Sequence, residues 1–338
     1  LVDQKTPKRS GEMKKCFSVL LVVLIAFCAN VAESGEEQLS DSRVIAIATL
    51  MSHPALDAVR ENLKEELKQQ GFVEGKNIKY ISRNANGQVQ LAANIATELA
   101  AREPDVIVAI TTPMAQAVAK VARCPVVFAA VTDPIGAGIV NSLNQNEGNI
   151  TGTSDAWPYK DQLELIRQIS PDAKRLAVLY NPGEAASQYG IKQIRLYAKE
   201  LGFELLEGSV SSTGEVYPVA QNLSRRSDVL FLSSDNTVIA GVAAAVKVAV
   251  EHKKPLYVGD SGTVEKGGVA AVSVGYAKLG SETGKLVARF LHGERNIPVV
   301  VAQGDETYIN KKAAAMMGVT IPERILAKAT KVYEEIKE

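Results

Sequence analysis

The sequence is poor in cysteine and histidine, and these shortages exclude two common ways of building a site. Of its 338 residues, 3 are cysteine and 3 are histidine. Cys16 and Cys28 both lie within the first 34 residues, which are treated below as a leader, so Cys124 stands alone in the rest of the chain and no disulfide is expected there. No two histidines, and no histidine with a cysteine, have the spacing of a metal site. We therefore expect neither a metal nor a cofactor.

An excess of one charge is also lacking, and so are the motifs of common enzymes. The 38 basic and 38 acidic side chains balance. No basic stripe alternates with aromatic residues, so nucleic acid is not an expected partner. No Gly-x-Gly-x-x-Gly follows the first apolar run, which disfavours a dinucleotide. The stretch Gly259-Asp-Ser-Gly262 lacks the glycine spacing of a nucleophile elbow. The sequence therefore predicts a protein that is not an enzyme.

The N-terminus has the parts of a secretory signal. Lys14 and Lys15 precede an apolar run over residues 17–29, and small residues follow it. A short membrane anchor is the alternative, but this run is shorter than the 17 to 25 residues that span a bilayer. Lipid attachment at Cys28 is disfavoured by the bulky Phe27 before it. We expect residues 1–34 to be a leader and the product to be periplasmic or otherwise extracytoplasmic.

Downstream of residue 43, short apolar runs alternate with amphipathic segments. Only 5% of the residues are aromatic, so the core must be built from Ala, Val, Ile and Leu. Strands alternating with helices of this length predict parallel sheets flanked by helices, an α/β fold. The expected strands are 44–51, 77–82, 105–111, 125–131, 175–180, 203–209, 228–233 and 255–259. The expected helices are 54–70, 88–102, 113–122, 158–169, 187–201, 214–225 and 239–252.

The pattern repeats in the two halves of the chain. Residues 104–134 and 227–261 each read Asp, apolar strand, polar junction, Ala-rich helix, Pro, apolar strand, Asp. Any two βαβ units resemble each other to some degree, but the matching Asp133 and Asp260 favour a true repeat. We therefore predict two doubly wound parallel-sheet lobes with a cleft between them.

Polar residues gather where strands give way to helices. Ser233-Ser-Asp-Asn-Thr237 follows one expected strand, and Thr111-Thr112-Pro113 follows the equivalent strand of the other half. In open α/β sheets, ligands gather at the carboxyl ends of strands. Helix N-termini at such places offer unpaired N–H groups that suit a carboxylate or another anion. Both junctions are therefore expected to face a ligand in the cleft.

Several stretches together resemble a known family. They are SHPALDAVRENLKEELKQQGF, ITTPMAQAVAK, VVFAAVTDPIGAGIV, NITGTSD, LYNPGEAAS and YAKLGSETGKLVARFLHGE. The resemblance is to ABC-transporter substrate-binding proteins of the tryptophan/tyrosine-transporter type, which have the type I periplasmic-binding-protein fold. It implies lobes joined by three crossings, near residues 155–157, 274–276 and 297–301. The implied lobes are 43–154 with 275–296, and 155–274 with 297–338.

The resemblance also implies a ligand and partners. The ligand would be a small molecule, an amino acid with an aromatic or hydrophobic side chain, delivered by a monomer to an ABC permease with its ATPase. An acid such as Asp155, Asp235 or Asp260 would take the ammonium group. The candidate ligand-binding residues are Ser52, His53, Thr111, Thr112, Thr132, Asp133, Ser154, Asp155, Asn181, Glu184, Ser187, Asp235, Asn236, Asp260 and Tyr276.

Alternatives stay open at several of these positions. Loop packing competes with ligand contact at His53, and turn capping does so at Asp133. Trp157 suits hinge packing better than stacking on a ligand. The family pattern is also broken at three places: Gly275 replaces an acid, Ala277 an aromatic residue and Ala186 an amide. These changes bear on which ligand the protein binds, and a solute that is not an amino acid is an alternative ligand. A sensor that presents its closed form to a membrane receptor is an alternative function.

Overall fold

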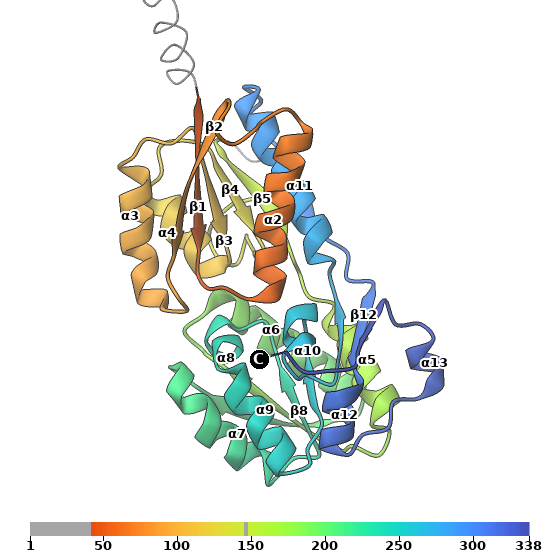
Figure 1. Ribbon diagram of the computed structural model, residues 1–338. Coiled ribbons are helices and arrows are strands. Elements are labelled where there is room, and N and C mark those ends of the chain that lie inside the picture. The colour runs from red at the N-terminus through yellow and green to blue at the C-terminus, as the bar shows by residue number, and fades with distance from the viewer. Residues whose placement is uncertain (1–41, 145–147, 338) are drawn as a thin grey trace, which may run out of the picture.

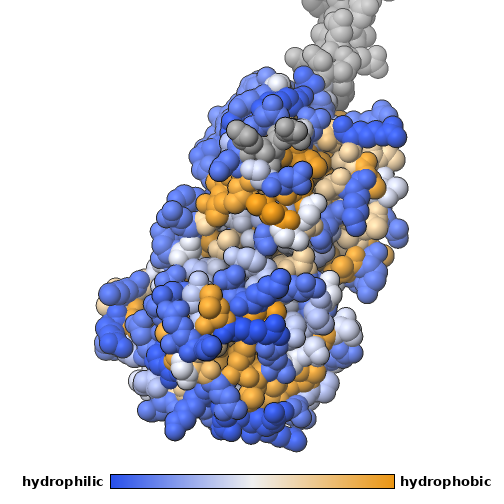
Figure 2. Space-filling model, turned by 180° about the vertical axis from the view of Figure 1, so that it is seen from behind, coloured by the Kyte–Doolittle hydropathy of each residue, from blue (hydrophilic) through white to orange (hydrophobic). Residues whose placement is uncertain are grey.

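The computed structural model describes residues 42–144 and 148–337, which form two α/β lobes stacked one above the other (Figure 1). The predicted leader, with Cys28, lies outside these residues. Within the described part of the chain, no helix is both long and apolar enough to cross a membrane. The surface seen from behind is largely hydrophilic, with apolar patches on both lobes (Figure 2).

The first lobe is built on a six-stranded parallel sheet whose inner strands are buried on both faces. The strand β1 (Arg43–Thr49) shows the pattern, because its last five residues are all buried. Continuous burial of this kind is typical of a parallel sheet covered by helices on both sides. The other strands are β2 (Ile78–Asn84), β3 (Val106–Ile110), β4 (Val126–Ala129), β5 (Ile150–Ser154) and β11 (Val300–Val301), in the order β11-β5-β4-β3-β1-β2.

Helices cover this sheet on both faces (Figure 1). The helices α3 (Ala92–Ala100) and α4 (Thr112–Val121) lie on one side, and α2 (Pro54–Gln69) and α11 (Tyr276–Leu291) on the other. Small residues let α11 approach α2 closely: a Cβ atom on Gly280 would lie 2.4 Å from the backbone oxygen of Val59. The α2–α11 pair therefore fixes residues 276–291, which follow the second lobe's parallel strands in the sequence, to the first lobe.

The second lobe combines a parallel sheet with a smaller mixed sheet. The parallel sheet has the order β7-β6-β8-β9, from β6 (Arg175–Tyr180), β7 (Glu204–Ser209), β8 (Val229–Leu232) and β9 (Leu256–Val258). In the second sheet, β12 (Glu306–Asn310) pairs antiparallel with β10 (Ala270–Ser273) and parallel with β13 (Lys331–Tyr333). The helices are α5 (Tyr159–Ile169), α6 (Ala185–Glu200), α7 (Val216–Ser224), α8 (Asn236–Ala240), α9 (Val242–Glu251), α10 (Ser261–Glu265), α12 (Lys311–Met317) and α13 (Glu323–Leu326).

The chain passes between the lobes at three places: from β5 to α5, from β10 to α11, and from β11 to β12. Each lobe encloses its own apolar core. The predicted boundary at residue 297 is shifted, because Ile297 is buried in the first core and Val300 pairs with Thr153. Residues 297–301 thus pack with the first lobe, and the third crossing follows them.

The predicted α/β class with two parallel-sheet lobes is confirmed, and its departures are local. The mixed sheet was not expected, because β10, β12 and β13 are short and pair across a long sequence separation. The helix expected over 239–252 is divided into α8 and α9 at Gly241. A Cβ atom there would lie 2.7 Å from Val216 Cγ2, so the packing requires glycine at this joint.

Candidate ligand-binding cleft

A cavity lies where the carboxyl ends of the strands of both lobes meet. The space between protein atoms there, including space open to solvent, is about 440 Å³. Nine of the residues predicted from the sequence line it: His53, Thr111, Thr112, Thr132, Asp155, Asp235, Asn236, Asp260 and Tyr276. The other lining residues are Met51, Ala55, Leu56, Ala130, Trp157, Ala186, Ser234 and Ile239.

The charges around the cavity are of one sign. Three carboxyl groups line it, those of Asp155, Asp235 and Asp260, each at most 5% exposed. Among the described residues that form the lining there is no lysine or arginine, and His53 is the only basic side chain. Buried carboxylates are costly unless they are paired or hydrogen-bonded. The cavity is therefore suited to a ligand that brings a positive charge.

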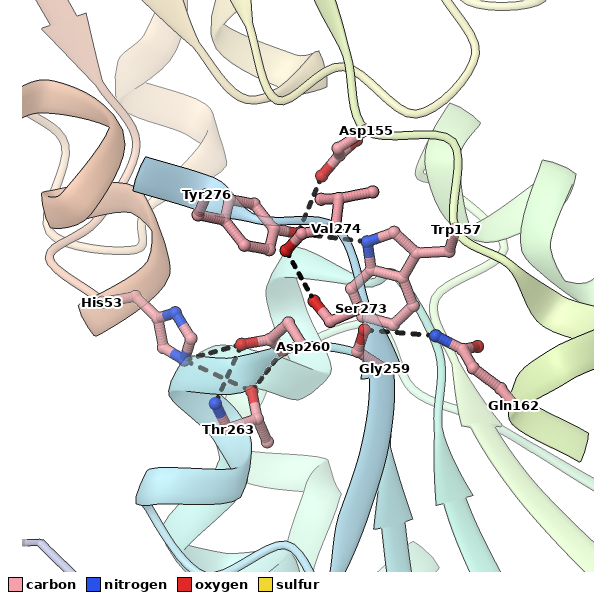
Figure 3. Close-up of polar contacts among 10 residues, drawn as sticks. All are labelled: His53, Asp155, Trp157, Gln162, Gly259, Asp260, Thr263, Ser273, Val274 and Tyr276. Carbon is pink, nitrogen blue, oxygen red and sulfur yellow. Dashed lines mark hydrogen bonds and ion pairs between the residues drawn. The ribbon is translucent and has the colours of Figure 1, made fainter. Parts of the chain in front are cut away.

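Asp155 sits at the centre of a network that joins two of the hinge crossings (Figure 3). The Tyr276 hydroxyl donates to Asp155 Oδ2 at 2.9 Å, and the indole N–H of Trp157 donates to the Tyr276 hydroxyl oxygen at 3.2 Å. The Thr132 hydroxyl donates to Asp155 Oδ1 at 3.2 Å. Burial raises the pKa of Asp155, and these neutral donors oppose the shift only in part. A cationic ligand group beside Asp155 would stabilise its charged form.

His53, another residue of the cavity lining, connects the two lobes through its contacts with Asp260 and Thr263 (Figure 3). It lies at the start of α2 in the first lobe, and its Nε2 atom is 3.3 Å from Thr263 Oγ1 and 3.8 Å from Asp260 Oδ1 in the second. Asp260 in turn caps α10, because its side chain accepts from the backbone N–H of Thr263 at 2.8 Å. Burial lowers the pKa of His53, although the Asp260 carboxylate acts in the other direction. His53 thus has an interlobe contact as well as a place in the cavity lining.

The start of α8 differs from the expectation. The backbone N–H groups of Asn236 and Thr237 donate to Glu184, at 3.1 and 2.9 Å, and that of Val238 donates to Asp235 at 2.8 Å. The prediction that this junction offers free N–H groups to an anionic ligand is therefore wrong, because two carboxylates of the protein already occupy it. Burial and the neighbouring Glu184 raise the pKa of Asp235 to about 6.

The start of α4 in the first lobe differs from the start of α8 in its hydrogen bonding. Thr111 occupies the N-cap position, but its side chain makes no capping hydrogen bond. Its hydroxyl oxygen is buried and has no hydrogen-bond partner among the residues that the structure describes. Its backbone has φ +88° and ψ 156°, a region that residues with a side chain rarely adopt. The Thr111 hydroxyl therefore has no protein partner, whereas the backbone N–H groups at the start of α8 are bound to Glu184 and Asp235.

Six predicted residues do not line the cavity. Asn181, Glu184 and Ser187 lie behind it, where the Ser187 hydroxyl donates to Asp235 at 2.7 Å and the Asn181 amide to Thr237 at 2.9 Å. Asp133 caps a turn by accepting from the N–H of Gly136, the alternative that the sequence had left open. The remaining two are Ser52, whose side chain is exposed, and Ser154, which donates to the backbone oxygen of Thr132.

The sequence reasoning missed most of the apolar lining. Met51, Leu56 and Ile239 carry no signal that separates them from core residues, because apolar side chains near strand ends are common. Ser234 lies inside the polar junction that the sequence singled out and could have been named. Trp157 was assigned to hinge packing; it does pack, since a Cβ atom on Gly259 would lie 1.8 Å from its ring, yet it also lines the cavity.

The lobes are in contact across the cavity. The hydroxyl oxygens of Thr132 in the first lobe and Ser234 in the second lie 2.9 Å apart. Next to His53, a Cβ atom on Gly262 of α10 would lie 2.8 Å from the backbone nitrogen of Ala55 on α2. The structure is thus a closed arrangement, in which side chains of both lobes surround one small cavity.

Proteins of related sequence support this description of the fold and the closure. A curated relative, the tyrosine-binding protein of Clostridioides difficile, is 34% identical over 284 residues, 82% of each chain. A domain from Streptococcus pneumoniae crystallised with L-Trp is 33% identical, with a TM-score of 0.83 over 86% of this chain and 99% of that one.

An open, ligand-free substrate-binding protein from Clostridium difficile is similar at the level of sequence but less so in shape. It is 32% identical and covers 87% of this chain and 100% of its own, yet its TM-score is only 0.66. The open structure and the tryptophan complex are nearly equally similar to this chain in sequence. The lower TM-score of the open structure therefore indicates that the lobes of this protein are arranged more as in the tryptophan complex. The family model for ABC transporter substrate binding protein matches residues 44–333. That family binds solutes and does not transform them, and this chain, with its two α/β lobes of the type I periplasmic-binding-protein kind, belongs to it.

Proposed function

We propose that this protein captures an amino acid with an aromatic side chain between its lobes and delivers it, as an extracytoplasmic monomer, to an ABC permease with its ATPase. The observation that carries the proposal is the composition of the cavity as the described residues form it: three carboxyl groups, no lysine or arginine, and two aromatic rings, those of Trp157 and Tyr276, at the central Asp155. Relatives that bind tyrosine and tryptophan support it.

Asp155 is the group that we assign to the ligand's ammonium. Its two carboxyl oxygens accept from Thr132 and Tyr276, which are neutral donors. Asp235 and Asp260, by contrast, cap helices of their own lobe through hydrogen bonds to backbone N–H groups. Asp155 therefore gains the most from a cation, since its burial is offset least by the protein itself.

The three departures from the family pattern have unequal weight. Ala277 is exposed and does not line the cavity. A Cβ atom on Gly275 would lie 2.6 Å from Glu306, so a side chain there would meet that residue of the mixed sheet. Only Ala186 is part of the lining. The changes at 275 and 277 therefore leave an aromatic ligand possible, and Ala186 is the position at which we expect this protein to differ in ligand preference.

Closure would couple binding to delivery. We take the predicted lobes as the moving units, with residues 297–301 counted in the first. The contacts of Thr132 with Ser234 and of His53 with Thr263 form only when the lobes meet. A ligand that touches both lobes favours the closed state by its differential affinity. The leader would direct the chain out of the cytoplasm.

Calorimetric titration of the exported protein with L-Tyr, L-Trp and L-Phe, with L-Leu and myo-inositol as comparisons, tests the proposal. We expect saturable binding of at least one aromatic amino acid. Asp155→Asn should weaken it by about tenfold or more, since a hydrogen bond to a charged group contributes about 1.5–3 kcal/mol and about 1.4 kcal/mol is tenfold. Asp161→Asn, at an exposed position on α5, is the matched control. Binding of myo-inositol alone would refute the amino-acid assignment.

A further inference from the structure

We propose that Gln162 is a positioning residue for ligand binding: it does not line the cavity, but its side-chain amide fixes the backbone on which the placement of Trp157 and Asp260 depends. Gln162 lies on α5 of the second lobe, just after the first crossing, and is 2% exposed. The inference rests on the proposed function only in the choice of aromatic amino acids as probes.

The amide nitrogen of Gln162 joins the ends of two strands. Its Nε2 atom donates to the backbone oxygen of Gly259, which follows β9, at 3.1 Å, and to that of Val272 in β10 at 2.9 Å. Figure 3 shows the contact with Gly259. Gly259 directly precedes Asp260, and β10 leads into the second crossing between the lobes. One side chain on the helix after the first crossing thereby holds both strand ends.

The oxygen of the same amide is left over. Gln162 Oε1 is buried and has no hydrogen-bond partner among the residues that the structure describes. Buried polar atoms are nearly always hydrogen-bonded, so such an atom requires an explanation. Turning the amide over would place its oxygen against two carbonyl oxygens, neither of which can donate. The position therefore requires two donors at once, which an amide nitrogen supplies and a methionine or glutamate side chain does not.

The backbone held by Gln162 is the seat of the Trp157 ring. A Cβ atom on Gly259 would lie 1.8 Å from Cζ3 of Trp157, so the ring lies directly against the backbone there. The indole N–H of Trp157 donates to the Tyr276 hydroxyl, which in turn donates to Asp155. A shift of the Gly259 peptide would therefore move a ring that lines the cavity and disturb the network at Asp155.

The same peptide sets the position of Asp260. Asp260 follows Gly259 in the chain, lines the cavity and caps α10 by accepting from the N–H of Thr263. Its Oδ1 atom lies 3.8 Å from Nε2 of His53 in the first lobe. A displacement at Gly259 is therefore carried both to the cavity lining and to a contact between the lobes. A hydrogen bond elsewhere on α5 would hold the helix without controlling these two places.

Substitution of Gln162 tests the inference, with calorimetric titration of L-Tyr, L-Trp and L-Phe as the measure of binding. Gln162→Met keeps the length of the side chain and removes both donors, so affinity should fall by about fivefold or more. Gln162→Glu keeps the shape but replaces the amide nitrogen by an oxygen, and at pH 8 it should lose at least as much. It also carries the test if Gln162→Met does not fold. The matched controls Gln168→Met and Gln168→Glu, at an exposed position of the same helix, should leave affinity unchanged.

Two further measurements separate positioning from a general loss of stability. Trp157 is the only tryptophan of the chain, and acrylamide should quench its fluorescence more strongly in ligand-free Gln162→Met, because the ring loses its fixed seat. Gln162, Gly259 and Trp157 all belong to the second lobe, so this comparison does not depend on closure. Ile166→Val shortens a buried side chain of the same helix, and it should lower the melting temperature while leaving affinity and quenching unchanged.

An affinity of Gln162→Met within twofold of the wild type, or unchanged quenching of Trp157, would overturn the inference. So would a loss of affinity in Ile166→Val that matches its fall in melting temperature as it does in Gln162→Met, since stability alone would then explain both. If the wild type binds none of the three amino acids, the proposed function falls, while the quenching of Trp157 in the ligand-free variants still decides whether Gln162 positions the ring.

Discussion

The closed arrangement makes a sharp prediction for Gly262→Ala. Gly262 lies on α10 of the second lobe, where an added Cβ atom would lie 2.5 Å from His53 Cε1 and 2.8 Å from the nitrogen of Ala55 in the first lobe. Ordinary contacts of a Cβ atom begin near 3.4 Å. The methyl group therefore has no room in the closed form, and the lobes must separate slightly. When they are apart, the methyl group meets no such obstacle, and alanine favours the α10 helix over glycine.

The magnitude follows from the cost of overpacking. An extra methyl group in a well-packed contact costs about 1–3 kcal/mol. Because closure is coupled to binding, that cost should appear as a loss of ligand affinity of about fivefold to about 150-fold. The melting temperature of the ligand-free protein should be unchanged or slightly raised. Calorimetric titration with an aromatic amino acid gives the first quantity, and a thermal melt gives the second.

Two other glycines serve as controls. Around Gly214 the nearest atom to an added Cβ would be Ser212 Oγ at 4.0 Å, so Gly214→Ala should leave affinity unchanged. Gly280 is packed within the first lobe, 2.4 Å from the backbone oxygen of Val59, so Gly280→Ala should lower the melting temperature itself. Wild-type affinity in Gly262→Ala, or a loss of ligand-free stability like that of Gly280→Ala, would refute the interlobe explanation.

The cleft supports three more tests. Trp157 is the only tryptophan of the chain and lines the cavity, so L-Phe should change its fluorescence saturably; no change at a calorimetrically proven binding concentration would place the ligand elsewhere. Burial lowers the pKa of His53 in the closed form, so affinity should be full well above pH 6.5 and fall as the pH drops below it; His53→Gln should flatten a titration series from pH 7 to 5. Burial and Glu184 raise the pKa of Asp235 from 3.8 to about 6. The unfolded chain therefore loses this proton at a lower pH than the folded protein does, and the free energy of unfolding should decrease as the pH rises from about 4 to about 6. The slope is at most about 1.4 kcal/mol per pH unit, and equal slopes in denaturant melts of the wild type and Asp235→Asn would contradict it.

Much of the cavity could be predicted from the sequence because parallel strands order their ends. Every βαβ unit brings the carboxyl end of its strand to the same edge of the sheet, so the residues after a strand are known to meet there. His53, Thr111 and Asp260 were found in this way. The matched junctions of the two halves likewise indicated a cavity built from both lobes.

The hydrogen-bonding state of these groups could not be predicted. The junctions at Thr111 and at Asp235 look equally polar in the sequence, yet one keeps an unpartnered hydroxyl while the other is filled by Glu184. The difference depends on Glu184, about fifty positions away at the N-cap of α6, which only the tertiary fold brings to the start of α8. The apolar residues of the lining were not predicted for the same reason. A leucine that lines a cavity, such as Leu56, has the same sequence pattern as a leucine packed in the core.

The sequence by itself determined the alternation of strands and helices, the two-lobed repeat and the edge at which a ligand site lies, because these follow from local periodicity and from the right-handed winding of βαβ units. Only the tertiary structure decided which carboxyl groups are already in use, which hydroxyl is left without a partner, and which atoms touch across the lobes. Those properties arise from contacts between residues up to 210 positions apart, as between His53 and Thr263, and no local pattern encodes them.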